Sequence, residues 1–222
     1  MQTAADDIND WSIKNQLGLN TTKTKEMRIA FGNSPHIEPL EINSCTIERV
    51  NHSKLLGVII QDDLKWDLHV SYMYKKASKR LHYLRCLKRS GLSTSELRMI
   101  YLSIIRSVCE YACPVWSTSI TKEQSHDLES IQRRALRIIL PKLDYPEACE
   151  KLNIPSLASR RNEICRAFFT SMKNENHKLH DMLPQPRSSQ YILRRSLTYP
   201  LPKCNTKRYK DSFIPYCLFH YQ

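Results

Sequence analysis

The side chains most able to do chemistry in this sequence are clustered cations, and the chemistry that suits them is phosphate binding. The chain has 34 Lys and Arg against 22 Asp and Glu, which gives a net charge of +12. One cluster in residues 75–89 contains no acid and comprises Lys75, Lys76, Lys79, Arg80, Arg85, Lys88 and Arg89. A second comprises Arg133, Arg134 and Arg137. Such local positive fields attract a phosphate backbone. We therefore favour the interpretation that these cations bind nucleic acid over the interpretation that they are only a solvated surface.

Two pairs of adjacent aspartates have the composition of a divalent metal site for phosphoryl transfer. Asp6-Asp7 falls at the start of an expected helix, and Asp62-Asp63 falls between a strand and a helix. Acids at helix starts are favoured by the helix dipole alone, so we interpret both pairs as capping residues. Phosphate-loop, nucleophile-elbow, zinc-protease and dinucleotide motifs do not occur. We therefore expect neither a catalytic residue, nor a metal site, nor a cofactor in this chain.

The cysteines and the first residues bear on the compartment. The eight cysteines include no C-x-x-C pair, so we expect free thiols in packed positions. The acids Asp6, Asp7 and Asp10 stand where a signal peptide has positive charge and then an apolar run. No apolar run approaches the roughly 18 residues of a membrane span. We expect an intracellular protein of the cytoplasm or nucleus, neither secreted nor partnered with a membrane.

Hydrophobic periodicity predicts an α+β fold that is mainly α. Near the N-terminus it indicates a helix over 4–16 and then short strands over 27–31, 37–42, 46–50 and 55–60, the last continuous and buried. Scarce glycine, at four residues, also favours helices.

Three amphipathic helices are expected between Trp66 and Leu140, and short connections make them a small bundle. The second of these helices should be stopped by Pro114. Shorter helices follow over 146–152 and 159–172. Beyond His177 the chain is rich in proline and cations, including Arg194 and Arg195, and we expect an extended or loosely ordered basic tail.

Taken in order, four groups of residues resemble the C-terminal part of a non-LTR (LINE-type, jockey-like) retrotransposon reverse transcriptase. The first two are Trp11, Asn15, 17–20, 23–25 and Met27, and then 54–58, Asp62, 64–66 and His69. The others are 104–107, 110–111 and 114–116 with 128–129, 131–135 and Arg137, and finally the ending 207–215. The resemblance implies the end of the palm with a small antiparallel sheet in 1–65, a three-helix thumb in 66–142, short post-thumb helices in 143–180 and a basic tail in 181–222.

The resemblance also implies roles for particular residues. Lys23 and Lys25 would lie near the phosphates of an incoming nucleotide, and Leu56 and Gly57 would abut the primer strand. The two cation clusters would follow an RNA template or RNA–DNA hybrid by its phosphates. The family's catalytic aspartates would precede Met1, so the resemblance implies that this chain alone is inactive and that Mg²⁺ serves only an intact polymerase.

Two other interpretations remain open from the sequence. The chain could be a helical protein-interaction adaptor that uses its basic tail to hold an acidic partner. It could also be a transposon relic without function, because palm-end strands without their sheet would leave an open edge and exposed apolar surface.

Overall fold

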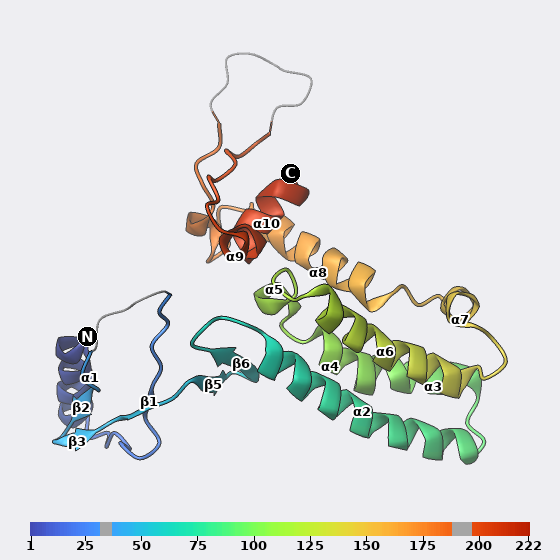
Figure 1. The fold of residues 1–222 in the computed structure, drawn as a ribbon, viewed down its shortest axis with the longest axis horizontal. Helices are drawn as coiled ribbons and strands as arrows, with labels where there is room; N and C mark the ends of the chain where they lie inside the picture. Colours follow the sequence, from blue (N-terminus) through green and yellow to red (C-terminus); the bar gives the residue numbers. More distant parts are fainter. Residues whose placement is uncertain (32–36, 188–196) are drawn as a thin grey trace. The chain divides into compact units, whose positions relative to one another are not determined.

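The computed structural model describes residues 1–31, 37–187 and 197–222. Most of these residues are helical (Figure 1). Helices make up 55% of the structure and strands 8%, in agreement with the predicted mainly helical α+β class. The chain divides into two compact units, residues 1–69 and 70–222, and each is described by itself.

The N-terminal unit combines one helix with short strand pairs. Helix α1 (Gln2–Lys14) packs on strand β2 (Glu41–Ile42), which pairs antiparallel with β3 (Cys45–Thr46). Strand β1 (Lys25–Glu26) pairs parallel with β4 (Glu48–Arg49). A small core of Ala5, Ile42 and Ile47 holds α1 to this part of the unit.

A β-hairpin replaces the continuous strand predicted over 55–60. Strands β5 (His52–Leu55) and β6 (Val58–Gln61) pair antiparallel, with Leu55 opposite Val58. Leu56 and Gly57 form the two-residue turn, with φ angles of 46° and 88°. Positive φ at both central residues is typical of the turns whose twist matches that of a hairpin. The prediction was wrong because the turn is hidden inside an apolar run. The strand expected over 27–31 is also not formed.

The C-terminal unit contains the long helices. Helix α2 (Asp67–Arg89) begins at the end of the first unit, and α6 (Lys122–Ile139) and α8 (Leu157–Met172) lie beyond it in the chain. Between α2 and α6 are α3 (Thr94–Ile100), a π-helical segment η1 (Tyr101–Arg106), α4 (Ser107–Glu110) and α5 (Cys113–Trp116). Helix α7 (Tyr145–Leu152) connects α6 to α8. Helices α2 and α6 agree with the first and third of the three helices expected between Trp66 and Leu140, and α7 and α8 agree with those predicted over 146–152 and 159–172.

The second predicted helix is interrupted, and Pro114 begins a helix rather than ending one. The chain passes from α3 through η1 into α4, then leaves the right-handed helical conformation at Ala112, whose φ is 50°. Pro114 occupies the first turn of α5. A proline there loses no intrahelical hydrogen bond, and its fixed φ suits the helical start.

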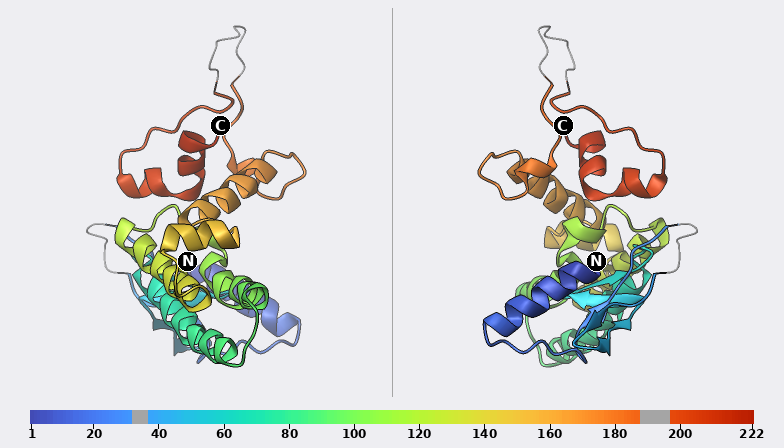
Figure 2. Two further views of the ribbon diagram at one scale, coloured as in Figure 1. Left: turned by 90° about the vertical axis from the view of Figure 1, so that its right-hand side faces the viewer. Right: turned by 90° about the vertical axis from the view of Figure 1, so that its left-hand side faces the viewer.

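The end of the chain is folded, which corrects the expectation of a loosely ordered tail. After the short 3-10 turn η2 (His180–Met182), residues 197–222 include helices α9 (Lys207–Asp211) and α10 (Phe213–His220). Helix α10 lies against α8 (Figure 2), and their shared core contains Phe169, Met172, Cys217 and Leu218. The apolar side chains of α10 find cover there, which a loose tail would not give them. Arg194 and Arg195 lie outside the described residues.

Candidate nucleic-acid interface

Helix α2 presents one face to the core and carries cations on the rest of its surface. Val70, Met73, Ala77, Leu81 and Leu84 are all buried, which marks the inward face. Residues 75, 79, 82, 86 and 89 lie on the opposite face, because successive residues of a helix turn by about 100°. Lys75, Lys79 and Arg89 therefore point outward, and they are exposed. The helix is about 35 Å long at 1.5 Å per residue.

Two cations on the flanks of α2 bind backbone carbonyls instead of solvent. Arg80 donates to the carbonyl of Ile104 in the π-helical segment, where the wider turn disrupts the regular i to i−4 ladder. Lys88 Nζ donates to the carbonyl of Ile139 at the end of α6, at 3.3 Å. Cations are favoured beside the exposed carbonyls of a helix C-terminus. Arg80 and Lys88 thus hold α2 against its neighbours.

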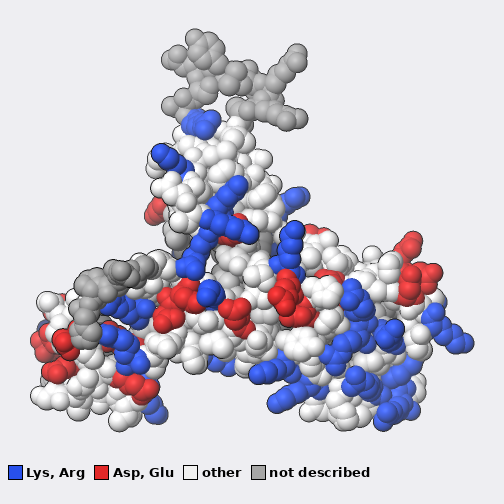
Figure 3. Space-filling view, viewed as in Figure 1, with Lys and Arg blue, Asp and Glu red and all other residues white. Residues whose placement is uncertain are grey.

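Arg134 brings the second cation cluster next to the first. Its Nη1 lies 3.4 Å from the Tyr74 hydroxyl and 3.3 Å from Ser78 Oγ, and both residues belong to α2. Arg133 lies over the ring of Tyr145, with 5.2 Å between its guanidinium carbon and the ring centroid. Arg137 is exposed in the last turn of α6. The surface over α2 and α6 consequently carries many Lys and Arg side chains (Figure 3).

Four cations of α2 have their charge available. Within the described ranges, no hydrogen bond or ion pair engages Lys75, Lys79, Arg85 or Arg89. Lys76 is also exposed and lies over the Tyr72 ring, 5.7 Å from its centroid. We call Lys75, Lys79, Arg85, Arg89 and Arg137 the basic ridge.

The other predicted site residues belong to the N-terminal unit. Lys23 is exposed in a turn, where its backbone N–H donates to the Asn20 side chain at 3.1 Å. Lys25 pairs with Glu48, its partner across the parallel strands, so its charge is partly neutralised. Leu56 and Gly57 stand at the tip of the β5–β6 hairpin, and Leu56 is 84% exposed.

The two acidic pairs lie in different local settings. Helix α1 begins at Gln2, two residues earlier than predicted, so Asp6 and Asp7 lie beyond its first turn and the capping interpretation is wrong for them. Asp63 is a turn residue that accepts from the Lys65 N–H at 2.9 Å, and α2 begins only at Asp67, so the capping interpretation is also wrong for Asp62-Asp63. Across 1–31, 37–187 and 197–222, His, Cys, Asp and Glu side chains form no group of three or more able to hold a metal ion. All eight cysteines are free.

A buried polar network on α6 was missed by the sequence analysis. Gln132 accepts from the Tyr101 hydroxyl at 2.6 Å and donates to the Tyr145 hydroxyl at 2.9 Å and to the Pro155 carbonyl at 3.0 Å. Glu129 accepts from Tyr145 and from the first N–H groups of α8, so it caps that helix. Burial raises the pKa of Tyr101 well above its usual value. A glutamine on the apolar face of an amphipathic helix was the available signal.

No family model, no curated protein and no solved structure matches this chain. Among the helices of the described residues, none is both long and apolar enough to cross a lipid bilayer.

Proposed function

We propose that the chain binds the phosphate backbone of an RNA–DNA hybrid through the basic ridge. The observation that carries this proposal is the availability of Lys75, Lys79, Arg85 and Arg89 on a helix whose opposite face is buried. A helix holds the backbone at these positions in place, so little backbone ordering is needed when a partner binds.

The dimensions of α2 support a duplex as the partner. Its length of about 35 Å is comparable to one turn of B-form DNA, roughly 34 Å, so α2 is long enough to follow a duplex over several base pairs. The ridge offers cations rather than side chains that read base edges, so binding follows phosphates and is insensitive to sequence. Tyr83, exposed on the same helix, provides a ring for contact with sugars or bases.

The resemblance to non-LTR reverse transcriptases extends the proposal to the role of the chain. In this view the α2–α6 region acts as the thumb, and the exposed tip of the β5–β6 hairpin, with Leu56 and Gly57, contacts the primer. Lys23 has no charged partner among the described residues and remains our candidate for nucleotide phosphates. We propose that this chain contributes template–primer binding and adds no nucleotides by itself, with or without Mg²⁺.

Binding of a labelled RNA–DNA hybrid, measured by fluorescence anisotropy at several salt concentrations, tests the proposal. Five phosphate contacts, one for each cation of the basic ridge, would lower the affinity roughly 500-fold between 50 and 200 mM salt. The same titration with hybrids of unrelated sequence should give similar affinities. A lack of binding at low salt, or an affinity that salt does not change, would contradict the proposal.

A further inference from the structure

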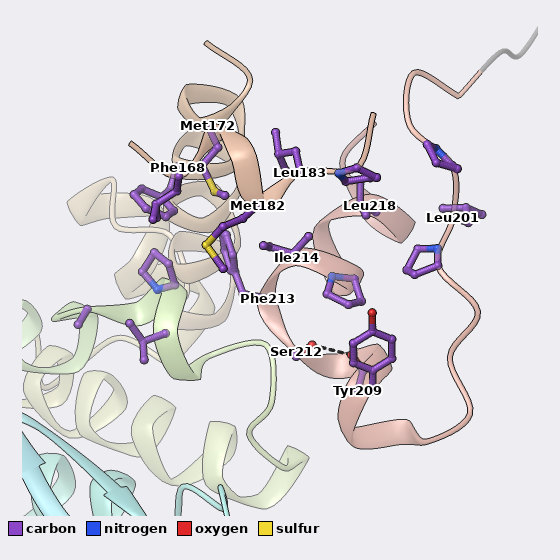
Figure 4. A pocket seen from close by; sticks show the side chains of 18 residues that line it. Phe168, Met172, Met182, Leu183, Leu201, Tyr209, Ser212, Phe213, Ile214 and Leu218 are labelled. Atoms are coloured by element: carbon purple, nitrogen blue, oxygen red, sulfur yellow. Dashed lines mark hydrogen bonds between the residues drawn. The ribbon is translucent and has the colours of Figure 1, made fainter. Parts of the chain in front are cut away.

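The C-terminal unit contains a large apolar cavity that the proposed function does not use. Its volume is about 900 Å³, and it is lined by 18 residues from α5, α8, η2, α9, α10 and the segments that adjoin them, including 200–202. Phe168 and Met172 form one wall, Leu201 and Tyr209 form the opposite side, and Phe213 lies between them (Figure 4). We call this cavity the C-terminal trough. None of the basic ridge residues lines it.

The mouth of the trough exposes apolar side chains to solvent. Met182 is 60% exposed, Val115 53% and Tyr209 49%, although all three line the cavity. A contiguous apolar patch of this kind is costly in water and is a feature of protein interaction sites. Methionine in such a surface adapts to the shape of a bound side chain.

The trough offers few hydrogen bonds to a ligand. Five of its 18 lining residues are prolines, which have no backbone N–H. The hydroxyl of Ser212 already donates to the Tyr209 carbonyl at 2.6 Å. An extended peptide would find few N–H donors for its own C=O groups there, and an unpaired buried C=O is costly. A helix satisfies its backbone internally, so it can insert side chains alone.

The charges around the trough are complementary to an acidic partner. The stretches 178–187 and 200–218, which hold most of the lining residues, contain two acids, Asp181 and Asp211. The same stretches contain six exposed cations: Lys178, Arg187, Lys203, Lys207, Arg208 and Lys210. An anionic ligand would therefore be attracted and oriented, while a cationic one would be repelled.

We propose that the C-terminal trough binds an amphipathic helix of a partner protein, with apolar side chains in the cavity and acidic residues on the flanks of that apolar face. The apolar walls select the apolar face, the missing donors select a helix, and the six cations select the acidic flanks. The trough lies within a single compact unit, so its shape belongs to that unit alone.

Two fluorescent peptides of about 18 residues, or five helical turns, test this proposal. Both carry leucine with helical spacing on one face, and the flanking positions are Glu in one peptide and Lys in the other. In anisotropy titrations of the whole chain, the Glu peptide should bind about tenfold more tightly than the Lys peptide, and added salt should weaken its binding. No binding of the Glu peptide, or equal binding of the two peptides, would overturn the proposal.

A matched pair of variants locates the binding. Met182→Glu places a charge at the mouth of the trough and should weaken the Glu peptide about tenfold or more. Met99→Glu makes the same change on α3, where Met99 is 66% exposed and outside the trough, and should leave binding unchanged. If both variants lose affinity for the Glu peptide equally, the assignment of its binding site to the trough is overturned. A concentration-dependent dimer that Met182→Glu abolishes also overturns it, because the trough would then hold a second copy. Hybrid binding should survive Met182→Glu, which separates this test from that of the basic ridge.

Discussion

Removing three outward charges from α2 should weaken nucleic-acid binding in an amount that can be worked out. The triple variant Lys75→Gln, Lys79→Gln, Arg89→Gln keeps side-chain length similar and touches no described hydrogen bond or ion pair. These positions lie on the solvent face of the helix, so we expect the thermal melt to stay close to that of the original chain.

The magnitude follows from counterion release. Each neutralised phosphate of a duplex contributes about −0.9 to the slope of log K against log salt concentration, so three lost contacts make the slope shallower by about 2.7. At 0.1 M salt the logarithm of the salt concentration is −1, and the affinity should fall by roughly 500-fold if each of the three cations reaches a phosphate.

The assay is the hybrid-binding titration, and a second triple variant controls for net charge. Lys14→Gln, Lys122→Gln, Lys151→Gln removes the same three charges from exposed positions on α1, the start of α6 and α7. This control should leave the slope nearly unchanged. If the two triple variants weaken binding equally, overall charge rather than the basic ridge attracts the nucleic acid, and the assignment of the site is refuted.

Three further predictions concern the scaffold. Gln132→Ala should lower the free energy of unfolding by about 2–4 kcal/mol in a denaturant melt, because it leaves the buried Tyr101 hydroxyl and the Pro155 carbonyl without their hydrogen-bond partner. Burial, with a smaller effect from the charge of Lys54, lowers the pKa of His69 to about 4. Below about pH 6.5 the unfolded chain binds a proton at His69 that the folded chain does not bind, so the stability of the fold should fall from pH 6.5 towards pH 4. The variant His69→Asn should show a smaller fall in stability over this range. A thiol reagent at pH 8 should modify exposed Cys45 at once and buried Cys109 only on unfolding.

Each scaffold prediction has its own control. Gln185→Ala changes the same residue type at an exposed position and should leave the melt unchanged. If Gln132→Ala and Gln185→Ala changed the free energy of unfolding equally, the hydrogen bonds of Gln132 would not stabilise the core. An imidazole signal of His69 that titrates near pH 6.5 by NMR would contradict its lowered pKa. Burial raises the pKa of Cys109 to about 12, so rapid reaction at pH 8 would show that the core around it opens.

The long helices could be predicted because their signals are local. The buried stripe of α2 repeats at helical spacing, and α6 starts at the capping box of Thr121 and Gln124. Asp144 and Glu147 mark the start of α7 in the same way. Such signals need only a few neighbouring residues, and tertiary packing then preserves them.

Other elements depend on contacts that no local pattern records. The turn at Leu56 and Gly57 is surrounded by apolar residues, so period and composition suggest one strand. Helix α10 is apolar on most sides and lacks the amphipathic pattern, because it packs against α8 and α5. Its place in the core depends on these tertiary contacts and is not recorded in its local sequence.

The sequence predicts that cations are clustered at the candidate site. It does not predict which of these cations are exposed and which bind other parts of the fold. The cations of residues 75–89 were all identified, yet Arg80 and Lys88 bind carbonyls of η1 and α6 that are distant in sequence. Arg134 likewise bridges to Tyr74 and Ser78. Which cations remain available is decided by those tertiary neighbours, so charge counting overestimates the interface.

The position of α10 has a consequence for the reading frame that encodes the chain. Phe213 to Gln222 are specified by only ten codons, yet they supply Cys217 and Leu218 to the packing around Phe169 and Met172. A stop codon or frameshift ahead of Phe213 would strip these side chains of their cover and direct the product towards aggregation.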